Sequence, residues 1–263
     1  MAYKLIAIDL DDTLLTHDGS INDRASAAIE KAVTKGIIVV LCTGRTQKGA
    51  QRFYDDLGLD SLLITTGGAE IFDGAGNALY TKNLDPHIAK RLLEFAYSRG
   101  IHANVYVNGD IVFRERNSFT DAYEQRAGYT GIVVPDLLER ELITPKVLYF
   151  ASEDILRGVR EDVEKEFPQL TIVRSYSTFL EFQDAGVNKG SALEYVADQY
   201  GVKRNETIAI GDTEIDIPML KYAGLGVAVE NGDAGAKQAA DIVCASNDEG
   251  GVADVIYKYI LEA

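Results

Sequence analysis

The sequence predicts an α/β protein in which a parallel-sheet core is interrupted by an inserted α+β domain. Near both ends of the chain, short apolar runs that stop at polar residues alternate with helical patterns, which is typical of buried parallel strands joined by helices. In the middle of the chain, the strand-like segments instead alternate between apolar and polar residues, as they do in a half-exposed antiparallel sheet. We therefore expect a core formed by residues 1–83 and 184–263 and an inserted domain formed by residues 84–183.

The first part of the chain predicts a β-α-β unit. Residues 4–10 form an apolar run that ends in a group of aspartates, which favours a strand buried on both faces. Residues 22–35 show helical spacing of apolar side chains, with Asn22 as the capping residue and Gly36 as the stop signal. A second apolar run at residues 37–42 predicts the next strand. A helix at 47–57, a strand at 61–65 and a hairpin within 71–79 follow.

The middle and the last parts of the chain differ in the pattern of their strands. Residues 102–107 and 111–114 alternate in polarity, which indicates antiparallel strands with one exposed face. After Asn188 the pattern of buried strands and helices returns. The expected elements there are a helix at 189–200, a strand at 207–210, a helix at 215–223, a strand at 226–229 and a short strand at 241–243.

Length, composition and charge restrict the class of protein. The chain has 263 residues, of which 46% are hydrophobic and 25% are charged, and this composition excludes a disordered or fibrous protein. The 41 acidic residues exceed the 26 basic ones and give a formal net charge of −15, which repels nucleic acid and anionic lipid. We therefore expect a small-molecule partner, no nucleic-acid partner and no membrane partner, and the sequence leaves the choice between monomer and dimer open.

Cysteine content and the N-terminal residues predict a cytoplasmic protein. Cys42 and Cys244 are too few for a disulfide framework, and both lie among apolar residues. The apolar stretch before Asp9 is too short for a signal peptide or for a membrane-spanning helix. We therefore expect reduced, buried thiols and a cytoplasmic location.

Three aspartates directly follow the first predicted strand. In a parallel sheet, the carboxyl ends of the strands face the ligand-binding crevice. Because side chains alternate along an extended chain, Asp9 and Asp11 point to the same side and could meet one ion or one substrate, whereas Asp12 points elsewhere. Two carboxylates this close repel each other, so without a cation one of them should hold its proton more tightly. The alternative is an acidic turn at which a strand meets solvent.

A second acidic cluster, residues 211–216, follows the predicted strand at 207–210. Asp212 lies at a helix start, and Asp216 lies one helical turn later. Taken alone, Asp212 is as readily a helix cap as a ligand. Both clusters nevertheless follow parallel strands, so they can converge on one crevice and form a site rich in carboxylate oxygens, which suits magnesium.

Two further segments offer groups that bind anions. Thr43, Gly44 and Arg45 supply a hydroxyl, a glycine that lets the main chain approach a ligand, and N–H groups suited to an anion; the alternative is a plain turn with Thr43 as the helix cap. Lys189 places a cation at a helix N-terminus, where the helix dipole disfavours it. This hints at an anionic partner, although an exposed lysine is the simpler explanation. Together with the acidic clusters, these residues supply the groups that phosphoryl transfer needs.

Four segments resemble, in order, the four motifs of the haloacid dehalogenase superfamily: residues 9–13 (Asp-Leu-Asp-Asp-Thr), 43–45 (Thr-Gly-Arg), 188–190 (Asn-Lys-Gly) and 211–216 (Gly-Asp-Thr-Glu-Ile-Asp). The insertion between the second and third motifs, together with residues 224–231, is similar to Cof-type phosphatases with a class IIB cap. The resemblance spans nearly the whole chain. It implies a Rossmann-like core with an α+β cap and magnesium-dependent hydrolysis of small phosphate monoesters, most often sugar phosphates.

The resemblance also implies roles for individual residues. Asp9 would attack phosphorus and form an aspartyl phosphate. Asp11 would be the general acid and base, which requires a protonated carboxyl in the first half-reaction. Magnesium would be bound by Asp9, Asp11 through its main-chain carbonyl, Asp212 and Asp216. The phosphoryl group would be bound by Leu10, Thr43, Gly44 and Lys189.

The chain departs from the Cof-type pattern at two positions. Ile215 stands where the fourth motif usually has asparagine, and Gly67 stands where asparagine usually follows the third core strand. Both changes delete a polar group near the phosphoryl site, so they bear on the rate or on the breadth of substrates. For this reason a weakly active, phosphometabolite-binding sensor is an alternative to an efficient enzyme.

Substrate specificity is expected to lie in the cap, because the core motifs contact only the phosphoryl group and the metal. A second alternative, a phosphatase for phosphorylated cofactors such as pyridoxal phosphate or a flavin nucleotide, would favour aromatic cap residues that stack on a ring. Cap movement is expected at residues 83–86 and 183–186. The candidate cap residues for substrate contacts are Arg114, Arg116, Tyr123, Arg126 and Tyr129.

Overall fold

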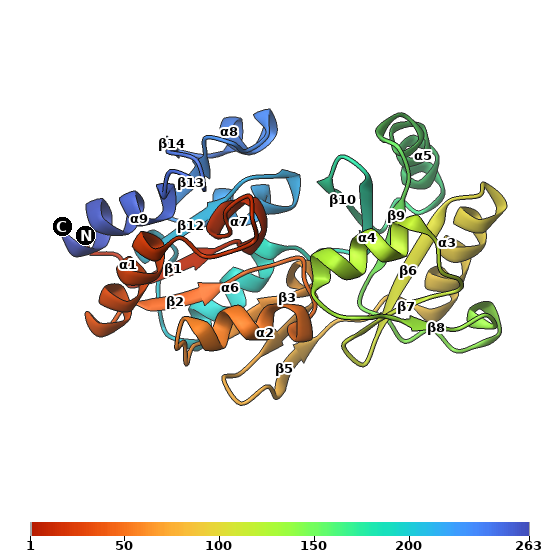
Figure 1. The fold of residues 1–263 in the computed structure, drawn as a ribbon, viewed down its shortest axis with the longest axis horizontal. Coiled ribbons are helices and arrows are strands. Elements are labelled where there is room, and N and C mark those ends of the chain that lie inside the picture. The colour runs from red at the N-terminus through yellow and green to blue at the C-terminus, as the bar shows by residue number, and fades with distance from the viewer. Residues whose placement is uncertain (1, 263) are drawn as a thin grey trace.

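A parallel sheet lies at the centre of the structure, a computed structural model that describes residues 2–262 (Figure 1). Every neighbouring pair of strands in this sheet is parallel. Four of its five strands are apolar and almost wholly buried, as strands covered on both faces must be, whereas the edge strand at residues 242–244 is partly exposed. The strands in spatial order are β14 (Ile242–Cys244), β13 (Leu225–Val229), β12 (Thr207–Gly211), β1 (Leu5–Ile8) and β2 (Ile38–Leu41).

Helices cover both faces of the parallel sheet. Alternate residues of β1 belong to different hydrophobic clusters, with Ile6 and Ile8 on one face and Leu5 and Ala7 on the other. The first face is covered by α1 (Asp23–Thr34), α2 (Gln47–Asp56) and α9 (Gly251–Ile256). The second face is covered by α6 (Lys189–Gln199), α7 (Ile217–Tyr222) and α8 (Ala234–Ala239).

The strand order places β1, from the first part of the chain, beside β12, from the last part, in the middle of the sheet. From β1 the chain moves outward to β2, whereas from β12 it moves in the opposite direction to β13 and β14. β1 and β12 are therefore neighbours, and Ile8 lies beside Ile210. In open α/β sheets, ligands bind outside the carboxyl ends of the strands at such a reversal point.

The strand expected at residues 61–65 belongs to a separate antiparallel sheet. This strand, β3 (Leu63–Thr65), pairs with β4 (Glu70–Phe72), which pairs in turn with β5 (Ala78–Thr81). A single parallel bridge between Cys42 and Ile64 links β3 to the end of β2. The chain turns back after β3 because Thr66, Gly67 and Gly68 adopt positive φ angles, with values of 51°, 67° and 100°, which reverse the backbone direction.

The middle of the chain forms a second layered unit, which we call the cap; the parallel sheet and its helices are the core. The cap sheet is mostly antiparallel, with one parallel pair at its edge. In spatial order its strands are β10 (Thr171–Tyr176), β11 (Phe179–Gln183), β9 (Val147–Phe150), β6 (His102–Val107), β7 (Asp110–Phe113) and β8 (Ile132–Val133). One face packs against α3 (Pro86–Ser98) and α5 (Glu153–Glu166), and α4 (Ser118–Ala127) lies on the other face, between the cap sheet and the core (Figure 1).

The predicted fold class is confirmed: a parallel α/β core carries an additional α+β unit. The helix expected at 215–223 begins with a 3₁₀ turn, Glu214–Asp216, and continues as α7. The limits of the two domains stay a prediction, although every strand of the cap sheet lies between His102 and Gln183. No helix in the described part of the chain is long and apolar enough to cross a lipid bilayer.

Candidate active site

The two acidic clusters lie side by side at the carboxyl ends of the central strands. Asp9 directly follows β1 and Asp212 directly follows β12. The main-chain N–H of Asp9 donates to the carbonyl of Ile210 at 3.0 Å, so the β1–β12 pairing continues to the start of the first cluster. The distance between the clusters is therefore set by strand pairing at the reversal point of the sheet.

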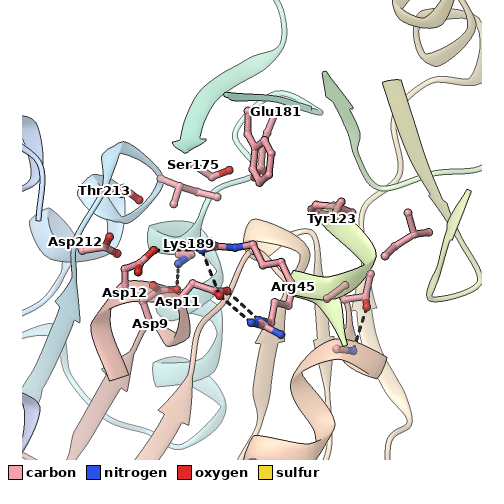
Figure 2. A pocket seen from close by; sticks show the side chains of 18 of the residues that line it. Asp9, Asp11, Asp12, Arg45, Tyr123, Ser175, Glu181, Lys189, Asp212 and Thr213 are labelled. Carbon is pink, nitrogen blue, oxygen red and sulfur yellow. Dashed lines mark hydrogen bonds and ion pairs between the residues drawn. The ribbon is translucent and has the colours of Figure 1, made fainter. Parts of the chain in front are cut away.

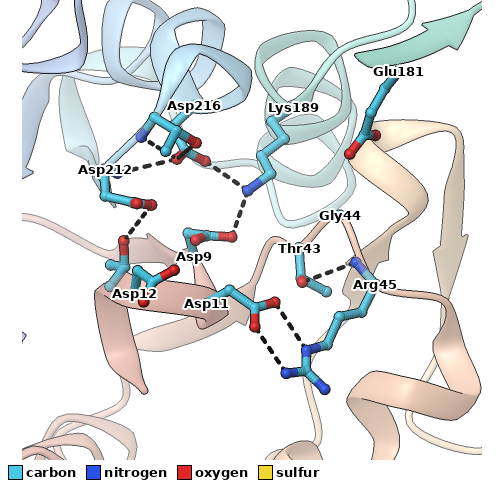
Figure 3. Close-up of polar contacts among 12 residues, drawn as sticks. Asp9, Asp11, Asp12, Thr43, Gly44, Arg45, Glu181, Lys189, Asp212 and Asp216 are labelled. Carbon is cyan, nitrogen blue, oxygen red and sulfur yellow. Dashed lines mark hydrogen bonds and ion pairs between the residues drawn. The ribbon is translucent and has the colours of Figure 1, made fainter. Parts of the chain in front are cut away.

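Three buried carboxylates gather at this point (Figure 3). Asp9, Asp212 and Asp216 each offer an oxygen, and these oxygens lie within 4.8 Å of one another. Lys189 is 1% exposed, and its Nζ donates to Asp9 and, at 2.6 Å, to Asp216. The lysine expected at a helix N-terminus is thus buried rather than exposed, and its anionic partners are two of the aspartates.

The loop after β12 is folded around Asp216. Its Oδ2 accepts the main-chain N–H groups of Asp212 and Thr213, both at 3.0 Å. A Cβ at Gly211 would lie 2.5 Å from the Cβ of Asp216, so only glycine fits there. Thr213, not Asp212, occupies the N-cap position of the following turn. Asp212 instead accepts the hydroxyl of Thr13 at 3.0 Å, and the interpretation of Asp212 as a helix cap is wrong.

Burial controls the protonation of this cluster. It raises the pKa of Asp9 to about 7, against the opposing charge of Lys189. Burial, together with repulsion from Asp216 and Asp9, raises the pKa of Asp212 well above its ordinary value. Burial alone would lower the pKa of Lys189, but Asp216 and Asp9 hold it well above its ordinary value.

The carboxylate cluster suits a divalent cation. When ionised, its three carboxylates exceed the single ammonium by two negative charges. All of its ligand atoms are carboxylate oxygens, which magnesium prefers. A bound divalent cation would also favour the ionised form of the buried acids. The residues present therefore fit the metal that the sequence predicts.

Asp11 faces away from the carboxylate cluster. The chain leaves the extended conformation after β1, and Asp12 adopts a φ of 59°, so the alternation expected for these aspartates does not bring the Asp9 and Asp11 side chains to one ion. The Asp11 carboxylate accepts Nε and Nη2 of Arg45 at 2.9 and 2.8 Å, and Arg126 lies 3.3 Å away. The role of its main-chain carbonyl as a metal ligand stays a prediction.

The protonated state expected for Asp11 is not the state that its surroundings favour. Burial alone would raise the pKa of this carboxyl, but the hydrogen bonds and charge of Arg45, with the charge of Arg126, hold the pKa below its ordinary value. Asp11 is therefore ionised in this arrangement. It can donate a proton only after the two guanidinium groups have moved away from it.

The Thr43–Arg45 segment joins the end of β2 to the start of α2. Thr43 is fully buried, and its Oγ1 accepts the main-chain N–H of Arg45 at 3.1 Å, so its hydroxyl proton is free to donate elsewhere. Thr43 is not the helix cap: Thr46 caps α2 by accepting the N–H of Gly49 at 3.2 Å. Leu10 is the first residue of the turn Leu10–Leu14, which follows Asp9, and its side chain is buried in the core.

A cavity of about 70 Å³ lies between cap and core above the carboxylate cluster (Figure 2). Three of the candidate cap residues line it: Tyr123 and Arg126 from α4, and Tyr129 just beyond. The other two do not. Arg114 lies against the ring of Tyr97 and Arg116 pairs with Glu124. The sequence analysis missed five further cap residues that line the cavity, which are Ile111, Ala127, Ser175, Phe179 and Glu181.

The cap contacts three of the core loops that carry predicted site residues. Arg126 lies 3.2 Å from Asp12, Arg160 of α5 forms two hydrogen bonds with Glu214 at 2.9 and 2.7 Å, and Lys146 donates to the carbonyl of Gly44 at 2.9 Å. Sequence reasoning gave no signal for these contacts, because each joins residues from different domains. These contacts between cap and core therefore help to position the site loops.

Known proteins share the sequence and the fold of this chain. Residues 6–256 match the family model of haloacid dehalogenase-like hydrolases. The Bacillus subtilis 5-amino-6-(5-phospho-D-ribitylamino)uracil phosphatase YcsE is 32% identical over 98% of this chain and 96% of its own. The crystal structure of a haloacid dehalogenase-like hydrolase from Bacteroides thetaiotaomicron is 28% identical, with a TM-score of 0.86 over 97% of this chain and 99% of that one. A subclass IIB sugar phosphatase shares the fold, with a TM-score of 0.85 and 24% identity over 96% of this chain and 97% of its own.

Proposed function

Because this chain belongs to the haloacid dehalogenase-like hydrolases and is a phosphatase of that family, we propose that it is a magnesium-dependent enzyme for small phosphorylated metabolites, above all sugar phosphates. The observation that carries the proposal is the convergence of Asp9, Asp212 and Asp216 with Lys189 beneath the cap. The cytoplasmic location stays a prediction.

The proposed reaction has two steps. In the first, a carboxylate oxygen of Asp9 attacks phosphorus, the ester P–O bond breaks, and the leaving alkoxide takes a proton from Asp11. In the second, water attacks the aspartyl phosphate, Asp11 takes the proton of that water, and inorganic phosphate leaves while Asp9 is regenerated. Magnesium bound by Asp9, Asp212 and Asp216 would offset the repulsion between the carboxylates and the anionic phosphate.

The remaining core residues hold the phosphoryl oxygens. The Thr43 hydroxyl, the Gly44 N–H and the Lys189 ammonium supply three donors that are fixed by the surrounding structure. Donors fixed before the reaction stabilise developing charge without reorganisation. Leu10 belongs to the same proposed set, at the turn that follows Asp9.

Substrate entry requires movement of the cap. The cavity of about 70 Å³ is much smaller than the roughly 300–1,000 Å³ of common small-molecule sites. An incoming anionic substrate would compete with Asp11 for Arg45 and Arg126, since both arginines line the cavity. We place the hinges at residues 83–86 and 183–186, and closure would exclude water during the first step.

A second candidate substrate class is a phosphorylated compound with a planar ring. The observation that favours it is the aromatic lining of the cavity by Tyr123, Tyr129 and Phe179, because such side chains pack against flat rings. The relative YcsE is named for a phosphorylated ribitylaminouracil, which joins a polyol chain to a ring.

Phosphate release from a panel of metabolites tests the proposal. The panel contains sugar phosphates, pyridoxal phosphate, a flavin nucleotide and p-nitrophenyl phosphate, each with magnesium and with EDTA. We expect magnesium-dependent release, fastest with a sugar phosphate. Undetectable turnover, together with stabilisation of the protein by the same compounds, would instead support the sensor alternative.

Substitution of the nucleophile tests the covalent step. Asp9→Asn should lower kcat by about 10⁴-fold or more, because an amide does not attack phosphorus to form the aspartyl phosphate. Circular dichroism should show an unchanged fold. Asp154→Asn, at a side chain that is 92% exposed on α5, is the matched control and should retain full activity. An active Asp9→Asn protein would contradict the mechanism.

A further inference from the structure

We propose that Glu181 of the cap accepts a hydrogen bond from a hydroxyl group of the substrate's leaving group. This inference rests on the proposed phosphatase function and narrows it to phosphate esters that carry a hydroxyl group near the ester, such as sugar and polyol phosphates. It makes Glu181 a specificity-determining residue.

Glu181 is the single ionisable residue of strand β11. It lies on β11 between Leu180 and Phe182, which are buried in the cap. Its side chain is 4% exposed and lines the same cavity as Asp9 and Lys189 (Figure 2). A buried carboxylate costs free energy unless it is paired and hydrogen-bonded, so its position in the cavity needs both a countercharge and a further partner.

Lys146 supplies the countercharge and fixes the carboxylate. Its Nζ donates to Glu181 Oε2 at 2.8 Å and to the carbonyl of Gly44 at 2.9 Å, and it lies 4.8 Å from the centre of the Tyr106 ring. Lys146 is 1% exposed. Glu181 is thereby held between the cap sheet and the Thr43–Arg45 segment, and it cannot swing out of the cavity without breaking a buried ion pair.

The second oxygen of Glu181 is left for a ligand. Within the described residues, Oε1 has no hydrogen-bond partner. It faces the Thr43–Arg45 segment (Figure 3), where a Cβ built on Gly44 would lie 3.9 Å from it. An ionised carboxylate only accepts hydrogen bonds, and a dianionic phosphoryl group has no proton to give. Within a bound phosphate ester, the donor would therefore come from the leaving group, and a hydroxyl is the donor that sugar and polyol phosphates carry.

The test compares substrates with and without hydroxyl groups. For Glu181→Gln, the ratio of kcat/KM for ribose 5-phosphate to kcat/KM for p-nitrophenyl phosphate should fall by about 5- to 10-fold, because the amide oxygen of glutamine accepts a weaker, neutral hydrogen bond in place of the charge-assisted one. Glu124→Gln is the matched control, because this cap glutamate pairs with Arg116 outside the cavity, and it should leave the ratio unchanged. If Glu181 only neutralises Lys146, both substrates will lose the same factor, and the inference is wrong.

A second measurement covers the case in which Glu181→Gln does not fold. Thermal stabilisation of Asp9→Asn protein by glycerol 3-phosphate is compared with stabilisation by propyl phosphate, which lacks the hydroxyl groups. We expect about tenfold tighter binding of glycerol 3-phosphate, and equal binding of both overturns the inference. Because this assay needs no turnover, its result is independent of whether the unaltered protein hydrolyses any ester, which is the test of the proposed function.

Discussion

Ile215 and Gly67, the two departures from the family pattern, are neighbours in the folded protein. A Cβ on Gly67 would lie 3.3 Å from Cδ1 of Ile215 and 3.0 Å from Oε1 of Gln183. Gln183 is fully buried and donates its Nε2 to the carbonyl of Thr66 at 2.7 Å. The apolar side chain of Ile215 therefore fills the space beside Gly67, and the two replacements act as one packing unit rather than as two independent losses.

A double-mutant cycle at these positions tests that coupling. Gly67→Asn alone should lower the free energy of unfolding by about 1–3 kcal/mol, because the new side chain meets Gln183 and Ile215 in a packed site. Combined with Ile215→Asn, the effects should depart from additivity by at least about 0.5 kcal/mol. Urea unfolding of the four proteins measures this. Additive effects would show that the two positions do not share a packing site.

At the scale of elements, α4 connects the cap to the reaction site. It carries Tyr123 and Arg126 into the cavity, and its start is fixed by Asn117. The Asn117 side chain accepts the N–H groups of Phe119 and Thr120 at 2.9 and 3.2 Å, and its Nδ2 lies 3.0 Å from Nδ1 of His102 on β6. One side chain thus caps the helix and ties it to the cap sheet.

Loss of the Asn117 side chain, which caps helix α4, should affect both the stability of the protein and substrate binding. Asn117→Ala should lower the free energy of unfolding by about 1 kcal/mol and raise KM more than it lowers kcat, because Tyr123 and Arg126 lose their fixed position. Asn22→Ala is the matched control: Asn22 caps α1 by accepting the N–H of Arg24 at 2.9 Å, and it does not line the cavity. It should cost similar stability with no change in KM. An unchanged KM in Asn117→Ala would show that the position of α4 does not affect substrate binding.

At the scale of the whole molecule, stability and metal binding are coupled through the carboxylate cluster. Asp9, Asp212 and Asp216 come from both ends of the chain, so an ion that binds them joins segments that are separate in the unfolded protein. A ligand that binds only the folded state stabilises it, by about 2.7 kcal/mol when its concentration is 100 times its Kd.

Magnesium should therefore raise the melting temperature of the protein. In Asp212→Asn the rise should be lost, because one charged ligand is gone, whereas the exposed-site control Asp154→Asn should keep it. Differential scanning fluorimetry with a magnesium titration and an EDTA blank measures both. A similar rise in Asp212→Asn would place the stabilising ion elsewhere on this acidic chain.

Much of the core architecture follows from local sequence. The buried strands, the helix caps such as Asn22, and the position of each acidic cluster at a strand end depend on hydrophobic period and on residues close in the chain. The placement of β3 could not be derived in this way, because its antiparallel pairing depends on the positive φ angles that follow it. The partners of Asp11 could not be predicted from the sequence either, because Arg126 lies on a helix more than a hundred positions away.

The sequence alone determined that this protein has an α/β fold with aspartates at the ends of two strands. Periodicity and short motifs are properties of neighbouring residues, so they can be read without the structure. Only the tertiary structure decided that Lys189 bridges Asp9 and Asp216, that the guanidinium groups of Arg45 and Arg126 hold Asp11 ionised, and that Glu181 enters the cavity fixed by Lys146. The physical reason is that charge pairing and burial depend on distances between segments, and those distances arise from strand order and cap closure rather than from local pattern.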